Sequence, residues 1–273
     1  MASPLKNIAI IGVYYPYSKA TLVASGNIGK IILDGLVESS NFNVTVISRK
    51  ESKATFPSGV TVVRTDLSDI GLIEAFKGQD AVISAVGATG LGEQKKFVDA
   101  SIRAGVKRFI PSEFSASSQD KAVGLANGFL EFDIANRTAT IWDGGNKRFT
   151  LTNEKQLGQA VASVLQHPQE TKNQYLYIAS VETTQNEILA SLEEASGEKW
   201  AVTKTTTDTQ VTEAVKKLTA GDFSGAFALV RSTTFGNTQG LHANYAADEK
   251  LANDMLGLGL EDVKDVVKRV VNK

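Results

Sequence analysis

The chain has 273 residues, 42% hydrophobic and 22% charged, with a formal net charge of −1. This composition is ordinary for a soluble globular protein, and the length allows one large domain or two smaller ones. Without a block of like charges, the sequence argues against direct binding of nucleic acid or of an anionic membrane. With no cysteine and 2 histidines, it excludes disulfides and cysteine nucleophiles and predicts no metal site. No apolar run is long enough for a bilayer and the first residues show no leader pattern, so we expect a cytoplasmic protein.

Short β-branched segments alternate with helical patterns over the first half of the chain. The segments that suit buried parallel strands are 7–12, 43–49, 59–66, 80–87 and 106–112. The helical patterns between them cover 26–39, 68–78 and 93–105. Ser68 is expected to cap the second helix, and Gly78 and Gly105 to end the second and third. This alternation predicts an α/β fold with a doubly wound parallel sheet of the Rossmann type.

The second half of the chain has a mixed pattern. Its expected elements are a hairpin over 137–153 with its turn at Asp143-Gly144-Gly145, a helix over 154–167, a strand over 173–180 and helices over 184–197 and 259–273. The last helix carries valines on one face, among them Val266, Val267 and Val270. Core packing explains this stripe better than a partner helix does.

A glycine-rich turn follows the first predicted strand, but eleven residues interrupt it. With residues 13–23 set aside, the sequence reads IAIIGASGNIGKIIL, which contains a G-x-x-G-x-x-G pattern. Glycines at such a turn allow a phosphate to approach closely, and the start of the next helix offers unpaired N–H groups. The pattern therefore predicts a dinucleotide-binding turn. Its residues would be Gly12, Gly26, Asn27, Ile28 and Gly29.

The end of the second predicted strand indicates which dinucleotide binds. It reads Ile47-Ser48-Arg49-Lys50, with no acidic residue before Glu51. An acidic residue at this place binds the ribose hydroxyl of NAD, whereas arginine accommodates the 2′-phosphate of NADP. Arg49, with Lys50 as a second charge, therefore predicts NADPH as the cofactor. The alternative is a solvated pair of surface charges.

Two further groups follow the third and fourth predicted strands. Asp66 is expected to flank the adenine, and capping of the next helix is an equally good explanation. Ala85, Val86 and Gly87 are small enough for the backbone to lie along the dinucleotide. A simple packing reason accounts for their size equally well.

The segment GVKRFIPSEF at 105–114 carries a specific resemblance. Together with VISRK at 46–50 and the repaired glycine turn, it resembles the NmrA-like and isoflavone reductase-like branch of the atypical short-chain dehydrogenases. Residues 127–165 and 184–200 are similar to the rest of that family, especially its fungal members. The resemblance implies an NADP-binding Rossmann domain at 1–126 and a smaller α+β substrate domain at 127–273, part of which returns to the Rossmann sheet. It also implies either an NADPH-dependent reductase of small, often aromatic compounds or a regulator that senses the dinucleotide.

The chain departs from this family after Phe114. Only 12 residues separate Phe114 from Asn127, where the family has a helix with the catalytic lysine and a further core strand. Twelve residues are too few for such a crossover. The lysine therefore has no matching position, and Lys121 is a weak candidate for it. By the resemblance, Ser112, Glu113 and Phe114 would line the nicotinamide side of the pocket, with a structural capping role for Ser112 as the alternative.

Residues 13–23 leave three interpretations open. They form a loop that covers the cofactor, they replace cofactor binding, or they are translated non-coding sequence whose counterpart is the gap after Phe114. Tyr15 and Lys19 have the spacing of the tyrosine–lysine pair of ordinary short-chain dehydrogenases. Because they precede the phosphate turn and flank Pro16, we interpret this spacing as coincidence.

We expect an NADPH-binding reductase of a small organic substrate. Its catalysis would be impaired if the missing lysine segment is required. The alternatives are a non-catalytic regulator with a protein partner and a defective variant that neither folds fully nor binds.

Overall fold

The computed structural model describes residues 5–12, 27–114, 130–240 and 242–271. The chain forms two compact units. The first consists of Met1–Ser115 and Lys155–Gln174, and the second of Ala116–Glu154 and Tyr175–Lys273. Among the described residues, no helix has the length and apolar character needed to cross a membrane.

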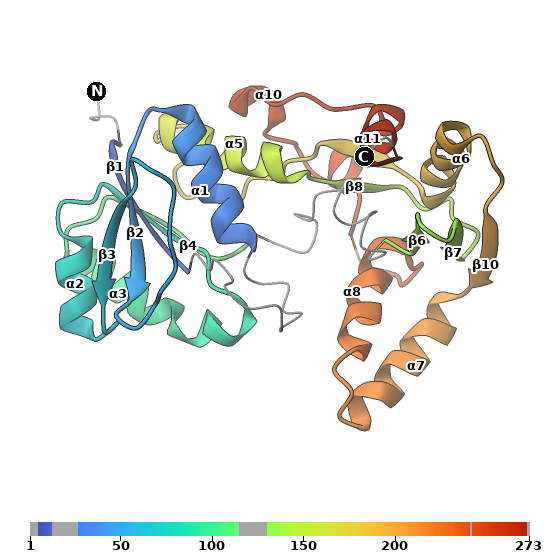
Figure 1. The fold of residues 1–273 in the computed structure, drawn as a ribbon, viewed down its shortest axis with the longest axis horizontal. Helices are drawn as coiled ribbons and strands as arrows, with labels where there is room; N and C mark the ends of the chain where they lie inside the picture. Colours follow the sequence, from blue (N-terminus) through green and yellow to red (C-terminus); the bar gives the residue numbers. More distant parts are fainter. Residues whose placement is uncertain (1–4, 13–26, 115–129, 241, 272–273) are drawn as a thin grey trace. The chain divides into compact units, whose positions relative to one another are not determined.

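The first unit is built on a parallel sheet (Figure 1). Among the described residues its strands are β1 (Asn7–Ile11), β2 (Asn43–Arg49), β3 (Thr61–Thr65), β4 (Ala81–Ser84) and β5 (Arg108–Ile110). They lie in the order β3-β2-β1-β4-β5, and every neighbouring pair is parallel. The predicted Rossmann-type sheet is confirmed, and so are the strand segments that the β-branched runs indicated. Because the order reverses beside β1, ligands of such a sheet bind at the carboxyl ends of β1 and its neighbours.

Helices cover this sheet. They are α1 (Asn27–Ser39), α2 (Asp69–Phe76), the 3-10 helix η1 (Ala88–Glu93), α3 (Gln94–Arg103) and α5 (Glu154–Gln166). The Ser68 hydroxyl accepts a hydrogen bond from the Gly71 backbone N–H at 3.1 Å, so the predicted cap of α2 is confirmed. Leu72, Phe76 and Phe97 of α2 and α3 pack with Ile47 and Val82 of the sheet in one hydrophobic cluster. This packing follows from the apolar stripe of each helix.

Helices α1 and α5 approach each other closely at a pair of glycines. A Cβ atom built on Gly35 would lie 2.4 Å from the backbone of Gly158, which no real contact permits. The end of α5 is held by Arg108 of β5, whose guanidinium donates to the Pro168 carbonyl and, at 3.2 Å, to the Thr171 hydroxyl. Burial lowers the pKa of Arg108 from its ordinary value. These contacts tie the segment 155–174 to the sheet of the first unit.

In its described residues, the second unit combines two small sheets with helices. Its strands are β6 (Phe132–Asp133), β7 (Thr138–Trp142), β8 (Phe149–Leu151), β9 (Val181–Thr183) and β10 (Ala201–Thr205). Its helices are α6 (Gln185–Ser196), α7 (Thr207–Thr219), α8 (Gly225–Phe235), α9 (Tyr245–Asp248), α10 (Asn253–Leu256) and α11 (Val263–Val271). Val267 and Val270 of α11 belong to one hydrophobic cluster with Trp142 and Phe235. Val266 is buried as well, so the predicted core role of the valine stripe is confirmed.

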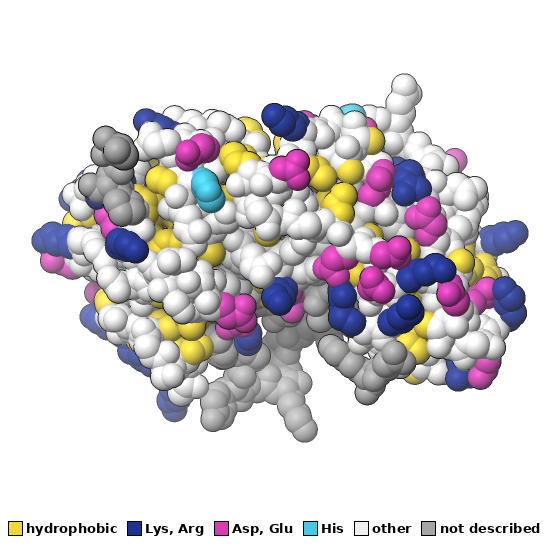
Figure 2. Space-filling model, turned by 90° about the horizontal axis from the view of Figure 1, so that it is seen from above, with side chains coloured by type: hydrophobic (Ala, Val, Ile, Leu, Met, Phe, Trp, Pro, Cys, Tyr) yellow, Lys and Arg dark blue, Asp and Glu magenta, His cyan; other side chains and the backbone are white. Residues whose placement is uncertain are grey.

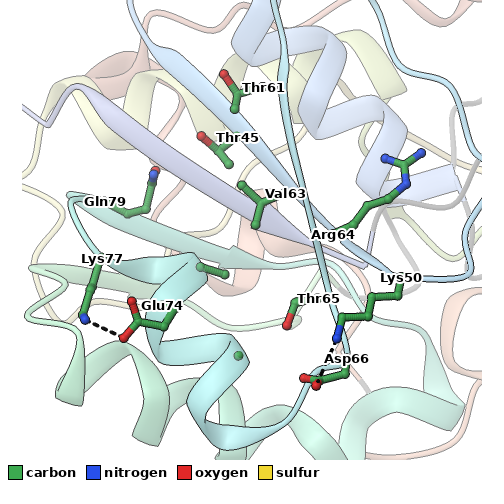
Figure 3. Close-up of a pocket in the computed structure, with 12 residues that line it drawn as sticks. Thr45, Lys50, Thr61, Val63, Arg64, Thr65, Asp66, Glu74, Lys77 and Gln79 are labelled. Atoms are coloured by element: carbon green, nitrogen blue, oxygen red, sulfur yellow. Dashed lines mark hydrogen bonds and ion pairs between the residues drawn. The ribbon is translucent and has the colours of Figure 1, made fainter.

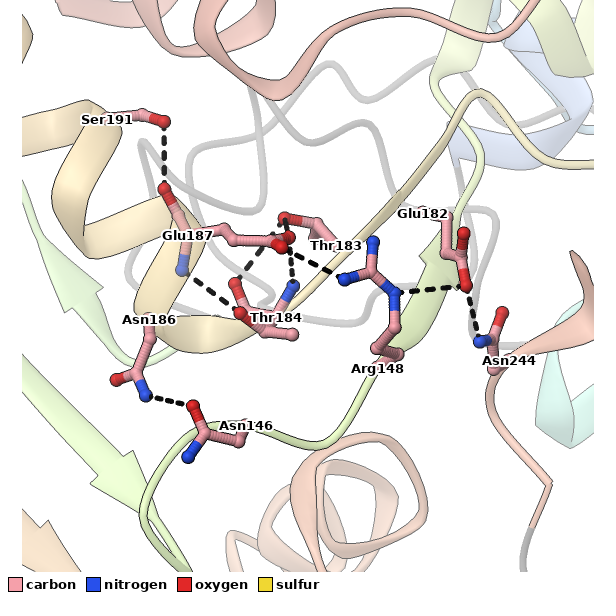
Figure 4. A network of polar contacts seen from close by, with 9 residues as sticks. All are labelled: Asn146, Arg148, Glu182, Thr183, Thr184, Asn186, Glu187, Ser191 and Asn244. Carbon is pink, nitrogen blue, oxygen red and sulfur yellow. Dashed lines mark hydrogen bonds and ion pairs between the residues drawn. The ribbon is translucent and has the colours of Figure 1, made fainter. Parts of the chain in front are cut away.

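A polar network fixes the start of α6 in this unit (Figure 4). The Arg148 guanidinium donates to the Glu182 carboxylate at 3.1 Å and to the Glu187 carboxylate at 2.9 Å. Glu187 and Thr184 also exchange hydrogen bonds as a capping box. The network therefore joins β9 to the first turn of the helix, and it stabilises the unit rather than offering free groups to a ligand.

The predicted hairpin over 137–153 is wrong. β7 pairs with β6 and β10, whereas β8 pairs with β9. The turn itself forms, since Gly145 N–H donates to the Trp142 carbonyl at 2.8 Å. The chain then leaves β7, because the Asp143 carboxylate accepts from the Thr207 N–H at the start of α7 and Lys147 donates to the Gly236 carbonyl after α8. Contacts with distant helices thus override a local turn signal.

The predicted strand over 173–180 is also wrong, since it contains a single bridge from Tyr177 to Leu251. The reason lies in Asn253, whose side-chain amide replaces a neighbouring strand. Its Oδ1 accepts from the Ala179 N–H at 3.1 Å and its Nδ2 donates to the Ala179 carbonyl at 2.7 Å. The backbone N–H and carbonyl of Ala179 are therefore satisfied without a ladder.

Candidate functional site: the carboxyl edge of the parallel sheet

Gly12 directly follows β1 at the centre of the carboxyl edge. Its φ of +97° lies in the region that favours glycine. A Cβ atom there would lie 2.7 Å from the carbonyl of Ala85 and from the N atom of Val86. The turn after β1 and the segment after β4 are therefore in backbone contact, and only glycine permits it.

The rest of the predicted glycine turn is described in part. Gly26 lies outside the described residues, as do residues 13–23 with Tyr15 and Lys19. Asn27 opens α1, Ile28 is half-buried and Gly29 is buried in the first turn of the helix. The helix therefore begins where the repaired motif predicts, and its first N–H groups are free of intrahelical partners.

Arg49 and Lys50 end β2 with exposed side chains. Within the described part of the chain, the Arg49 guanidinium has no hydrogen bond or ion pair, so it is free to bind an anion. Lys50 is committed instead to Asp66, with 3.4 Å between its Nζ and the carboxylate. The neighbouring Arg64 is also occupied, because it donates to the carbonyls of Ser52 and Ala54 at 3.2 Å each.

Asp66 organises the turn before α2. Its Oδ1 accepts from the Ser68 N–H at 2.9 Å. Hydrogen bonds from the side chain and the backbone of Ser68 lower the pKa of this exposed carboxyl from 3.8 to about 2. The cap of α2 is Ser68, so the capping role that was the alternative for Asp66 is wrong, and Asp66 instead accepts a hydrogen bond within the turn before the helix. Its contact with adenine stays a prediction.

A groove of about 460 Å³ lies between β3 and α2 (Figure 3). Thr45, Thr61 and Val63 line one end, and Lys50 and Asp66 the other. Its ion pairs, Lys50 with Asp66 and Lys77 with Glu74, are internal to the groove. Lys50 and Asp66 are predicted cofactor residues, but Gly12 does not line this groove, so the groove does not include the predicted phosphate turn.

Hydrogen bonds join the carboxyl ends of β1, β4 and β5. Ala85 N–H donates to the Ile11 carbonyl at 2.8 Å. The Ser112 hydroxyl donates to the Val86 carbonyl at 2.7 Å, and the Ser112 N–H donates to Oε1 of Gln94 at 2.6 Å. Glu113 is exposed, and Phe114 and Gly87 are half-buried. Sequence reasoning did not single out Gln94, because a polar residue opening a helix gives no sign of a partner 18 residues away.

The other residues considered as catalytic or metal-binding groups lie away from the carboxyl edge of the sheet or outside the described residues. Lys121 is outside the described residues. His167 lies at the end of α5, with Nδ1 2.9 Å from the Ser163 carbonyl oxygen. The described residues contain no group of three or more His, Asp or Glu side chains that could hold a metal ion. On the face shown in Figure 2, basic and acidic side chains are interspersed.

Comparison with known proteins identifies the class to which this fold and edge belong. A family model described as NAD(P)H-binding matches residues 24–137. Oxidoreductase aprR of Aspergillus flavus is 31% identical over 289 aligned positions, which cover 91% of this chain and 96% of that protein. The chain therefore belongs to the NAD(P)H-binding, oxidoreductase-like family that includes the NmrA-like and isoflavone reductase-like proteins, and the predicted family is confirmed.

Solved structures share the fold. The crystal structure of an isoflavone reductase has a TM-score of 0.72 and 19% identity, covering 97% of this chain and 99% of that one. Citrobacter triphenylmethane reductase, solved with NADP(H), has a TM-score of 0.67 and 17% identity, covering 97% of this chain and 99% of that one.

The comparisons also bear on the inserted segment and on the short segment after Phe114. The match to the family model begins at residue 24, directly after the segment 13–23. The aligned length with the Aspergillus protein also exceeds the 273 residues of this chain, so that relative carries residues that this chain lacks.

Proposed function

We propose that this chain is an NADPH-dependent reductase of a small organic substrate, aromatic by analogy with the relatives. The observation that carries the cofactor choice is Arg49, a guanidinium at the end of β2 without a partner among the described residues. A guanidinium binds a phosphate through two parallel hydrogen bonds, which NADH could not engage because it lacks the 2′-phosphate. Bound NADPH would supply the hydride for the reduction.

The residues of the edge fit a dinucleotide. Gly12 lets the turn after β1 lie against the backbone after β4, and the N–H groups in the first turn of α1 would donate hydrogen bonds to the phosphate oxygens. Arg49 would hold the 2′-phosphate, with Lys50 adding charge while paired with Asp66. The ends of β4 and β5, on the other side of β1, would then face the nicotinamide.

A non-catalytic dinucleotide sensor is the second candidate. It is favoured by the short segment after Phe114, which has no position matching the lysine of the family. Reduction needs a proton donor or a positive group beside the developing oxyanion. Without one, the chain would bind NADPH and act through a protein partner.

Calorimetry with NADPH and NADH tests the cofactor proposal. The intact chain is expected to bind NADPH more tightly than NADH. Arg49→Ala should weaken NADPH binding about tenfold or more, because charge-assisted hydrogen bonds are lost, and should leave NADH binding unchanged. Lys77→Ala removes a positive charge that is paired with Glu74 and serves as the matched control. Equal affinity of the intact chain for both dinucleotides would overturn the proposal.

Two further measurements separate the alternatives. Oxidation of NADPH in the presence of aromatic or enone substrates distinguishes a reductase from a sensor. A chain lacking residues 13–23 should bind NADPH as the intact chain does if that segment loops away, and better if it obstructs the turn. Absence of both binding and a cooperative thermal transition would mean that the chain is a defective variant.

A further inference from the structure

A row of contacts links the carboxyl ends of three neighbouring strands. Gly12, after β1, lies against the backbone of Ala85 and Val86, after β4. The Val86 carbonyl accepts the Ser112 hydroxyl, after β5, at 2.7 Å. The Ser112 N–H in turn donates to Gln94 Oε1 at 2.6 Å. We call the last two bonds, with Val86, Ser112 and Gln94, the serine clamp.

The clamp determines the position of the segment after β5. In the described sheet β5 is an edge strand of three residues, so pairing with β4 alone gives that segment little support. Ser112 is half-buried, and both of its hydrogen-bond donors are used: the hydroxyl binds the segment after β4 and the N–H binds α3. Gln94 is itself half-buried at the first position of α3. Loss of its side chain would leave the Ser112 N–H without its partner.

We propose that Gln94 is a positioning residue for the nicotinamide half of the cofactor, acting through Ser112. The inference rests on the proposed function. The strand order places Arg49 of β2 on one side of β1 and the clamp on the other, so a dinucleotide with its diphosphate at Gly12 has its adenosine and nicotinamide halves on opposite sides. The clamp therefore acts on one half of the ligand only.

Two ligands separate the halves in an experiment. NADPH contains both, whereas adenosine 2′,5′-bisphosphate contains the adenosine half and its 2′-phosphate but no nicotinamide. Gln94→Ala should weaken NADPH binding about fivefold, as expected for one lost hydrogen bond, and leave adenosine 2′,5′-bisphosphate binding unchanged. The fluorescence of bound NADPH, which comes from the nicotinamide, should change as well. Gln94→Glu keeps an acceptor oxygen and should restore both readouts.

Matched controls keep the test decisive. Ile102→Ala alters an exposed, uncharged position of the same helix and should change neither affinity. If Gln94→Ala does not fold, Ser112→Ala removes the bond to Val86 alone and should produce the same selective loss.

The outcomes separate this inference from the proposed function. If the intact chain binds neither ligand, the proposed function fails and the inference with it. If the intact chain binds both and Gln94→Ala changes neither the affinity ratio nor the fluorescence, the inference is overturned while the proposed function stands. An equal loss for both ligands would likewise overturn it, because it would indicate a purely structural role.

Discussion

The carboxyl edge of the parallel sheet is built differently on the two sides of β1. On the charged side, at the ends of β2 and β3, Arg49, Lys50 and Asp66 are exposed, and one ion pair of 3.4 Å joins two of them. On the clamped side, at the ends of β4 and β5, Val86, Ser112 and Gln94 are joined by hydrogen bonds between uncharged groups. Gly12 lies between the two sides.

This difference shows how one edge of a sheet can use separate groups to recognise a ligand and to position it. Exposed charges are solvated and contribute little to folding, so they are free to discriminate between ligands. Half-buried hydrogen bonds are costly to break and hold the backbone in one place. The charged side should therefore determine which dinucleotide binds, and the clamped side where its other half lies.

Substitution at Gly12 should have the largest effect, because it affects both sides. Gly12→Ala places a methyl group against Ala85 at a positive φ, which should lower the free energy of unfolding by about 3 kcal/mol or more. Denaturant titration would measure this. Gly59→Ala also has a positive φ but meets no atom within 4 Å, so it isolates the backbone strain from the contact. Equal losses in the two variants would contradict the close approach.

Arg49→Asp should reverse the preference for the dinucleotide. A carboxylate repels the 2′-phosphate and accepts hydrogen bonds from the ribose hydroxyls, so the ratio of NADPH to NADH affinity should fall about a hundredfold. Titration of both cofactors measures the ratio. The melting temperature should stay constant, because the Arg49 guanidinium makes no polar contact among the described residues. An unchanged ratio would remove the charged side from cofactor choice.

Ser68→Ala should affect stability without affecting the ligand. It removes the cap of α2, so the free energy of unfolding should fall by about 1 kcal/mol. Ser68→Asp keeps an acceptor for the Gly71 N–H and should recover most of the loss. Weaker NADPH binding by Ser68→Ala would show that the turn after β3 belongs to recognition as well.

Asp66 should give the smallest effect and a characteristic pH dependence. Its pKa falls from 3.8 to about 2 on folding, so the ionised form stabilises the folded state. This contribution is complete above about pH 4 and is lost as the pH falls toward 2. The difference in melting temperature between the intact chain and Asp66→Asn should therefore be constant from pH 7 to about pH 4 and shrink below it. A difference that grows on acidification would contradict the assignment.

The features that the sequence predicted are those with a local signature. Buried parallel strands read as continuous β-branched runs, and Ser68 precedes its helix in the usual way. Arg49 could be predicted as a phosphate-binding residue from its guanidinium and its position at the end of β2 alone. The hairpin over 137–153 failed because Asp143 and Lys147 bind helices more than sixty residues away. Gln94 left no signature for the same reason, since its role depends on a backbone N–H in another βα unit.

The contact between Gly35 and Gly158 bears on how variants of this protein would be interpreted in a genetic screen. A methyl group on either glycine would press α1 away from α5, and the first turn of α1 contains Asn27, Ile28 and Gly29 of the predicted dinucleotide-binding turn. Carriers of such changes would score as cofactor-deficient although neither position belongs to the predicted binding turn. Engineered libraries should therefore hold both glycines constant, and a lone substitution recovered at either one should be tested for folding before it is assigned to binding.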